Sequence, residues 1–131
     1  MTRKTCLVLI ILACLLACSC SEVRLSPKDR HFVRSDDFGE YNGLYVYTLA
    51  RDGELRVTDY SDKSGAPPVS QRIVGRWEEK DGTLMWHMSE RNVSITYVRN
   101  TEGVYVEEDG TYYVPVELMP VQVRDGMPLI E

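Results

Sequence analysis

Two histidines, His31 and His87, are the residues of this 131-residue chain best suited to proton transfer near neutral pH. A Ser–His–acid triad would have to use His87, but no glycine-flanked nucleophile turn accompanies it in the sequence. No cysteine stands near His87 to complete a zinc site, and the acidic loop Asp59–Gly65 lacks the ligand spacing of a calcium loop. The sequence therefore predicts a non-enzymatic protein without a metal or other cofactor.

All four cysteines lie within the first twenty residues. A basic start, Met1–Lys4, precedes the apolar run Leu7–Leu16, which is shorter than the ~20 residues that span a bilayer. The stretch Leu15-Leu16-Ala17-Cys18 resembles the lipobox of bacterial lipoproteins, although Leu16 is bulkier than usual. The resemblance implies cleavage before Cys18 and lipid attachment to Cys18, with Cys14 and Cys20 as alternatives. Ser19 then favours the outer membrane.

This interpretation divides the chain into a signal peptide (1–17), a lipidated N-terminus with a polar tether (18–42) and a small β-domain (43–131). Ser26-Pro27-Lys28-Asp29 has the form of a helix start, so one or two helical turns could dock Phe32 and Val33 on the domain; a flexible spacer is the alternative. Only Cys20 would remain as a thiol, which excludes an intramolecular disulfide. The mature protein would be anchored to the membrane by its lipid.

The charge balance also limits the partners. Removing residues 1–17 takes away two of the 15 basic residues and none of the 20 acidic ones, which leaves a net charge of −7. Such a charge argues against nucleic acid as a partner, and against attachment to anionic lipid through charge.

Four Asp-Gly pairs punctuate the rest of the chain, at residues 52, 81, 109 and 125. Asp-Gly suits two-residue hairpin turns, and the flanking segments are rich in β-branched and aromatic residues. We expect hairpins at 43–60, 72–89 and 103–118, a strand at 92–99, a loop at 61–70 and a short closing pair within 121–130. The fold class is all-β, an antiparallel meander of about seven or eight short strands in a barrel or sandwich. Gly75-Arg76-Trp77 resembles the Gly-x-Trp of lipocalins, which implies a lipocalin-like meander, although it lies mid-chain here.

Two-residue turns would fix which side chains share a face. Trp77 should oppose Trp86, with Gly75 opposite Met88, on a core face. The other two hairpins are apolar on both sides, so either both sides are covered or one aromatic side contacts a partner or ligand. The candidate binding face, outward or lining a cavity, comprises Tyr45, Tyr47, Tyr60, Val104, Val106 and Tyr113.

These observations favour a cell-envelope lipoprotein whose β-domain binds another envelope or extracellular protein. The first alternative is a lipocalin-like carrier of a small apolar ligand. The second is an inhibitor of a cationic hydrolase, suggested by the negative charge of the domain.

Overall fold

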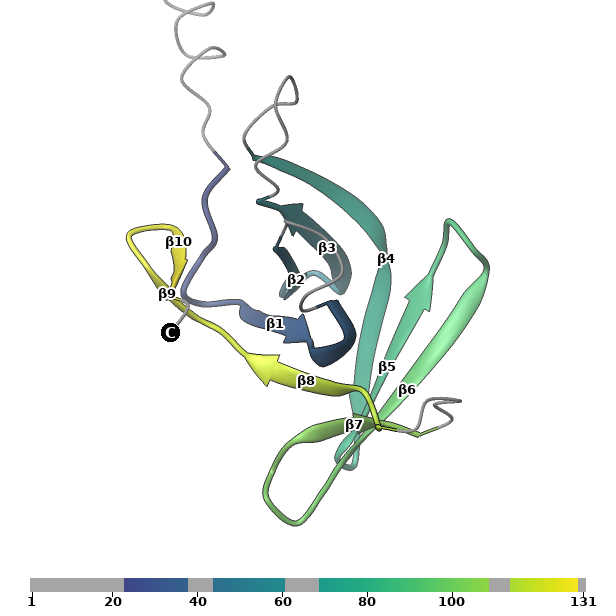
Figure 1. Ribbon diagram of the computed structural model, residues 1–131. Helices are drawn as coiled ribbons and strands as arrows, with labels where there is room; N and C mark the ends of the chain where they lie inside the picture. Colours follow the sequence, from purple (N-terminus) through teal and green to yellow (C-terminus); the bar gives the residue numbers. More distant parts are fainter. Residues whose placement is uncertain (1–22, 38–43, 61–68, 109–113, 130–131) are drawn as a thin grey trace, which may run out of the picture.

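A closed antiparallel barrel of eight strands forms the body of the protein (Figure 1). The computed structural model describes residues 23–37, 44–60, 69–108 and 114–129. Each strand pairs with the next along the chain, and the last pairs with the first, which confirms the predicted all-β meander and shows that it closes as a barrel. The strands are β1 (Arg30–Arg34), β2 (Tyr45–Leu49), β3 (Glu54–Asp59), β4 (Ser70–Lys80), β5 (Thr83–Met88), β6 (Val93–Arg99), β7 (Tyr105–Glu107) and β8 (Glu117–Pro120). A short 3-10 helix, η1 (Ser35–Asp37), follows β1.

Side chains from all eight strands fill the barrel interior. Trp86 on β5 is fully buried, with its ring centroid 5.0 Å from that of Tyr47 and 4.8 Å from that of Tyr97. The other buried members of this cluster are Phe32, Leu49, Leu55, Val57, Val74, Leu84, Tyr105 and Leu118. Eight strands enclose a space that side chains can fill, and here buried side chains from every strand, with contacting rings around Trp86, form a packed core.

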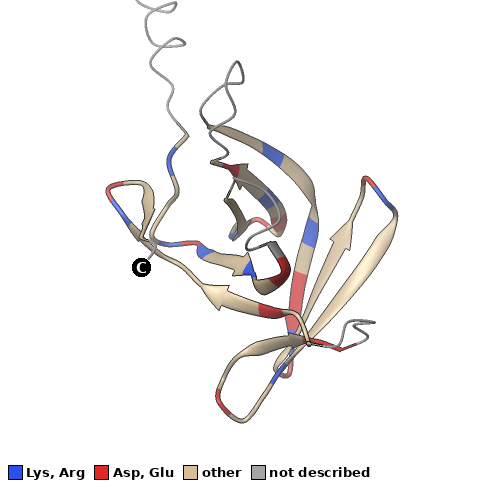
Figure 2. Cartoon of the chain, in the orientation of Figure 1, with Lys and Arg blue, Asp and Glu red and all other residues tan. Residues whose placement is uncertain are grey.

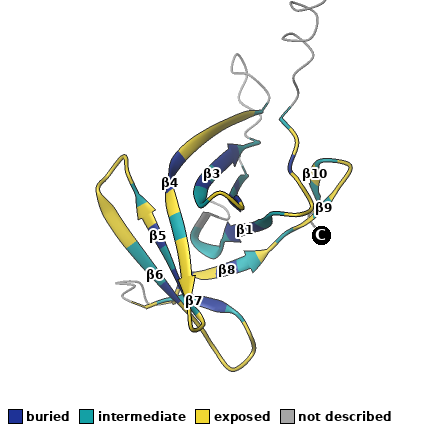
Figure 3. Cartoon of the chain, turned by 180° about the vertical axis from the view of Figure 1, so that it is seen from behind, coloured by how far each residue is buried: buried dark blue, intermediate teal, exposed yellow. Residues whose placement is uncertain are grey.

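A second apolar cluster lies on the outside of the wall formed by β8, β1 and β2. Val33 and Val46 point outward there and are buried by Leu25 and by the hairpin of β9 (Gln122–Arg124) and β10 (Met127–Leu129). Leu44, Tyr60, Met119, Val121 and Val123 complete the cluster. The outside of β4, β5 and β6 is largely exposed instead (Figure 3). The two-sided apolar character of β2 therefore reflects cover on both faces.

Two of the Asp-Gly pairs form the expected two-residue turns. Asp81 and Gly82 both have positive φ, as do Asp125 and Gly126. The first turn sets Trp77 opposite Trp86 and Gly75 opposite Met88, as predicted. The second joins β9 and β10, the expected closing pair.

The prediction for Asp52-Gly53 is wrong by one residue. Only Gly53 has positive φ, and the N–H of Gly53 donates to the Ala50 carbonyl, so the loop has three residues, 51–53. A three-residue loop ends in a left-handed residue and shifts the pairing of the strands. Leu49 consequently pairs with Leu55, and Tyr47 with Val57, so Tyr45 and Tyr47 share the interior with the apolar face of β3.

The register predicted around Asp109-Gly110 is also wrong. Tyr105 pairs with Leu118, whereas a two-residue turn would set it opposite Val114, which is 76% exposed. The turn itself lies outside the described residues. The pairing of β8 with both β7 and β1 closes the barrel, and that non-local requirement outweighs the local turn preference.

The boundary expected at residue 43 is wrong as well, because β1 belongs to the barrel. Phe32 pairs with Tyr47 on β2 and with Pro120 on β8. The helix expected from Ser26 does not form. Residues 27–28 make a hydrogen-bonded turn, closed by the Asp29 N–H on the Ser26 carbonyl, and β1 follows at once. Phe32 and Val33 are buried as expected, but within a strand that closes the sheet.

Candidate functional site

The residues of the predicted binding face do not lie together. Tyr45 and Tyr47 pack against the core inside the barrel, and Tyr60 packs in the outer cluster beside Val46. Val106 pairs with Val98 on the exterior of β6 and β7, and Val104 is half-buried in the preceding turn. Cys18 and Tyr113 lie outside the described residues. The register of the β2–β3 loop is the physical reason, since it places two tyrosines in the interior.

The two ends of the barrel carry different polar groups. We name them the Arg34 end, where β1 finishes, and the Arg30 end, where β1 starts and the turns at 51–53, 81–82 and 100–104 lie. The polar networks at both ends were not predicted from the sequence. Their members are up to 73 positions apart in the chain, so no local pattern connects them.

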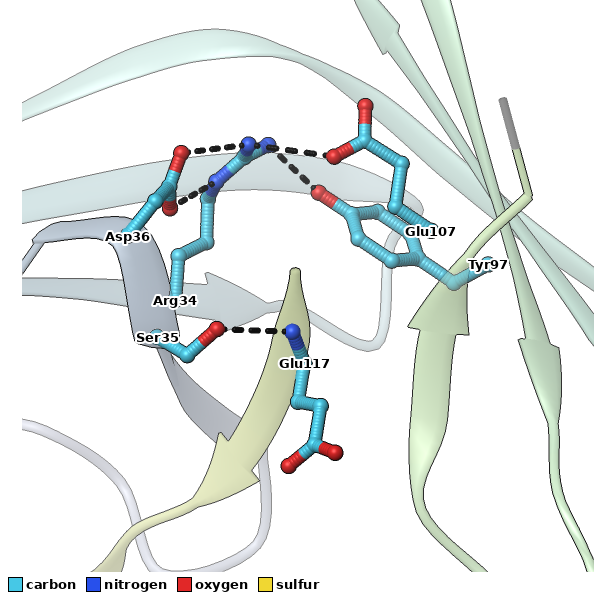
Figure 4. A network of polar contacts seen from close by, with 6 residues as sticks. All are labelled: Arg34, Ser35, Asp36, Tyr97, Glu107 and Glu117. Atoms are coloured by element: carbon cyan, nitrogen blue, oxygen red, sulfur yellow. Dashed lines mark hydrogen bonds and ion pairs between the residues drawn. The ribbon is translucent and has the colours of Figure 1, made fainter. Parts of the chain in front are cut away.

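A network around Arg34 closes the Arg34 end (Figure 4). The guanidinium binds Asp36 through two hydrogen bonds of 3.0 and 2.9 Å and donates to the Tyr97 hydroxyl at 2.7 Å. It also forms an ion pair with Glu107 at 3.4 Å. Its donors are therefore directed to groups of the protein itself.

Burial shapes the titration of this network. Burial of the guanidinium acts to lower the pKa of Arg34, but Asp36, Tyr97 and Glu107 outweigh it and raise the pKa above its ordinary value. Burial raises the pKa of Tyr97 well above its usual range, although the Arg34 cation opposes this shift. Arg34 is thus a permanent cation and Tyr97 a neutral hydroxyl, a structural arrangement that holds η1, β6 and β7 together.

A second network lies at the Arg30 end. Glu79 accepts hydrogen bonds from the Tyr105 hydroxyl and, at 3.2 Å, from Arg30. The hydrogen bond from Tyr105 is the main cause that lowers the pKa of Glu79; burial acts in the other direction, and Arg30 and Arg99 add to the lowering. Arg30 also lies over the Trp77 ring at 5.1 Å, and Arg99 over the Tyr105 ring at 5.0 Å.

An open pocket of about 560 Å³ lies beside this network. Its apolar lining includes Phe32, Leu118 and Val121. Its charged lining residues are Arg30 and Arg99, with one acidic residue, Asp29. Arg30 forms an ion pair with Glu79. Arg99 donates to the Tyr105 hydroxyl, lies over the Tyr105 ring, and its charge also acts on Glu79, but it forms no direct ion pair within the described residues. The pocket thus combines an apolar surface with a guanidinium that has donors to spare, which suits an apolar molecule with an anionic group.

His31 does not belong to a tether, because it is buried in β1. Its Nε2 donates to the Ser26 carbonyl at 2.6 Å, and the Thr48 hydroxyl donates to its Nδ1 at 2.8 Å. A carbonyl can only accept, which fixes the tautomer. His31 therefore binds the N-terminal segment to β2, a structural role.

His87 lies on the exterior wall between Ser94 and Glu78. The Ser94 hydroxyl donates to Nδ1 at 2.8 Å, and Nε2 donates to Glu78 at 3.2 Å. This order matches a Ser–His–acid relay, but the side chains of His87 and Glu78 are 46% and 65% exposed. Catalytic electrostatics require a site that excludes water, so we interpret the group as a cross-strand polar cluster.

A second open pocket, of about 590 Å³, adjoins His87 on the same wall. Ile73 and Val93 line it and are 59% and 47% exposed, which makes them the most exposed large apolar side chains of β4, β5 and β6. Arg76 and Met88 also line it. Figure 2 shows that the charges of β4 are grouped: two arginines precede two glutamates along the strand, and Lys80 ends it.

Two kinds of feature are absent from the described parts of the chain. Residues 23–37, 44–60, 69–108 and 114–129 contain no group of three or more His, Cys, Asp or Glu that could hold a metal ion. No helix within these ranges has the length and apolar character needed to cross a membrane.

Comparison of the chain with protein-family models, curated proteins and solved structures found no match.

Proposed function

We propose that this protein is a lipid-anchored component of the bacterial cell envelope, on the outer membrane, with no enzymatic activity. Support for the anchor comes from the order of a basic start, an apolar run and Leu15-Leu16-Ala17-Cys18, which lie outside the described residues. Several acyl chains on one cysteine anchor a protein stably, whereas one chain binds only marginally.

Labelling with radioactive palmitate tests the anchor. The wild-type chain should take up label, and Cys18→Ser should lose it, while the matched variant Cys20→Ser should keep it. Undiminished label on Cys18→Ser would move the attachment site to another cysteine.

The barrel, in this proposal, binds another envelope protein through its outer wall. The observation that carries it is the contrast between a filled interior and an exposed wall, on which Ile73 and Val93 line one pocket. Exposed apolar side chains that share a pocket are typical of interaction sites. The paired strands around them are rigid, which lowers the entropic cost of binding.

Photo-crosslinking in intact cells tests this wall. A benzoylphenylalanine at position 73 should give a discrete crosslinked product, and the same residue at position 98, where Val98 is 40% exposed on β6, should not. Val93→Asp should weaken the product at position 73 without changing the amount of protein. Equal products at both positions, or none at position 73, would reject the wall as the binding site.

The pocket at the Arg30 end supports a second candidate function, the carriage of a small apolar molecule with an anionic group. A fluorescent fatty-acid analogue should bind the purified barrel, and Arg99→Gln should weaken binding about tenfold, in the range of a charge-assisted hydrogen bond. Binding that does not respond to Arg99→Gln would exclude this pocket.

A further inference from the structure

The hairpin of β9 and β10 has an outward face with a composition unlike that of the barrel wall. Because Val123 packs in the outer cluster, the alternate residues of the hairpin face away from the barrel. These are the cross-strand pairs Arg124–Met127 and Gln122–Leu129, and all four side chains are exposed. The face thus presents one cation and two large apolar side chains, with no acidic residue among the four.

The N-terminal segment of the described chain leaves the barrel beside this hairpin (Figure 1). The Leu25 N–H donates to the Gly126 carbonyl at 2.9 Å, and Leu25 is 3% exposed. The side chain of Arg24 lies against Gly126, since a Cβ built there would be 3.0 Å from its aliphatic carbons. The hairpin is therefore the point at which the segment becomes fixed to the fold.

The distance along the chain between this point and the proposed anchor is short. Leu25 is seven positions after Cys18. A fully extended chain spans at most ~3.6 Å per residue, so about 25 Å is the greatest separation. If the lipid is in the bilayer, the hairpin is held close to the headgroups, at a high effective concentration.

The charges near the hairpin complement a lipid surface. Arg24, Lys28 and Arg124, on the hairpin and on the segment beside it, are exposed. The acidic residues there are Asp125 of the turn and the half-buried Asp29. Figure 2 shows basic and acidic positions side by side at this hairpin. Basic residues near an anionic surface favour binding, and apolar side chains such as Met127 and Leu129 can enter the headgroup region. The overall negative charge of the chain opposes binding of a detached barrel, so the effect depends on the anchor.

We propose that the outward face of the β9–β10 hairpin docks on the lipid surface to which the protein is anchored. The inference rests on the proposed lipid anchor at Cys18. Docking would orient the barrel, with β8, β1 and β2 toward the membrane and the exposed wall of β4, β5 and β6 on the side away from it, where a protein partner can reach it.

A thiol-reactive fluorophore tests the orientation. The lipidated full chain carries Cys20→Ser, so that one introduced thiol reacts, and is reconstituted into vesicles of phosphatidylethanolamine and phosphatidylglycerol. Met127→Cys is the reporter and Ile73→Cys the matched control, because these side chains are 49% and 59% exposed and lie on opposite sides of the barrel. Spin-labelled lipids should quench the fluorophore at position 127 and leave the one at position 73 unaffected.

Sedimentation of the same samples distinguishes a failure of hairpin docking from a failure of the lipid anchor. If the protein sediments with the vesicles but both positions are quenched equally or not at all, docking is refuted while the anchor stands. If the protein stays in the supernatant, the anchor fails and the docking proposal falls with it. Arg124→Gln should reduce the docked population about fivefold, whereas Arg91→Gln, an exposed arginine in the β5–β6 turn, should not. Equal effects of the two variants would contradict a specific basic face.

Discussion

Replacing Tyr97 by Phe removes one hydroxyl from the Arg34 network and keeps the ring. At pH 7 the free energy of unfolding should fall by about 1.5–3 kcal/mol, the range for a hydrogen bond to a charged group. Arg34 keeps its bonds to Asp36 and its ion pair with Glu107, so the loss should be near the lower limit.

The same substitution should change the pH dependence of stability. A tyrosine of the unfolded chain ionises with a pKa near ~10, whereas burial raises the pKa of Tyr97 in the folded protein. A raised folded pKa gives stability that is fully present below pH ~10 and is lost as the pH rises through the folded pKa. The loss is about 1.4 kcal/mol per pH unit, so the wild-type chain should approach the stability of Tyr97→Phe by about pH 11.

Urea unfolding followed by tryptophan fluorescence at several values between pH 7 and pH 11 measures both effects, since Trp86 packs against Tyr97. Tyr60→Phe is the matched control. Burial also raises the pKa of Tyr60, but its hydroxyl makes no hydrogen bond within the described structure, so the control should cost nothing at pH 7. A Tyr97→Phe variant as stable as the wild type at pH 7, with a difference that does not depend on pH, would refute the assignment of the Arg34–Tyr97 bond.

Three further predictions concern other parts of the fold. Gly75→Ala should lower the free energy of unfolding by about 3 kcal/mol or more in thermal or urea unfolding, because the added Cβ would lie 1.8 Å from the His87 carbonyl oxygen. The control Gly82→Ala has open space around it but a φ of +79°, so it should cost only about 1 kcal/mol. The reverse order of the two losses would contradict the register of β4 and β5. Leu25→Ala should cost about 2 kcal/mol and speed amide exchange in β9 and β10, whereas unchanged exchange would mean that the segment does not hold the hairpin. Dithiothreitol should leave the melting temperature of the chain lacking residues 1–17 unchanged, since all cysteines precede residue 21; a shift of several degrees would show that Cys20 takes part in a disulfide.

The sequence by itself determined the fold class and those hairpins whose turns are local. Asp81-Gly82 favours a two-residue turn because of its own backbone preferences. That turn sets the register of β4 and β5, so Trp77 pairs with Trp86. The same holds for Asp125-Gly126 and the closing hairpin. Short-range information suffices because turn and pairing involve neighbouring residues.

Tertiary structure decided the register of the other pairs and the extent of the barrel. An Asp-Gly pair fits both a two-residue turn and the three-residue loop at 51–53, and the choice between them places Tyr47 beside Trp86 in the interior. The polar segment around His31 contains a strand because β2 and β8 offer it partners on both sides. The Arg34 network joins residues up to 73 positions apart, so its members share no pattern in the sequence. Each of these outcomes depends on closing one sheet around one core, a requirement that acts between distant segments and leaves no local signal.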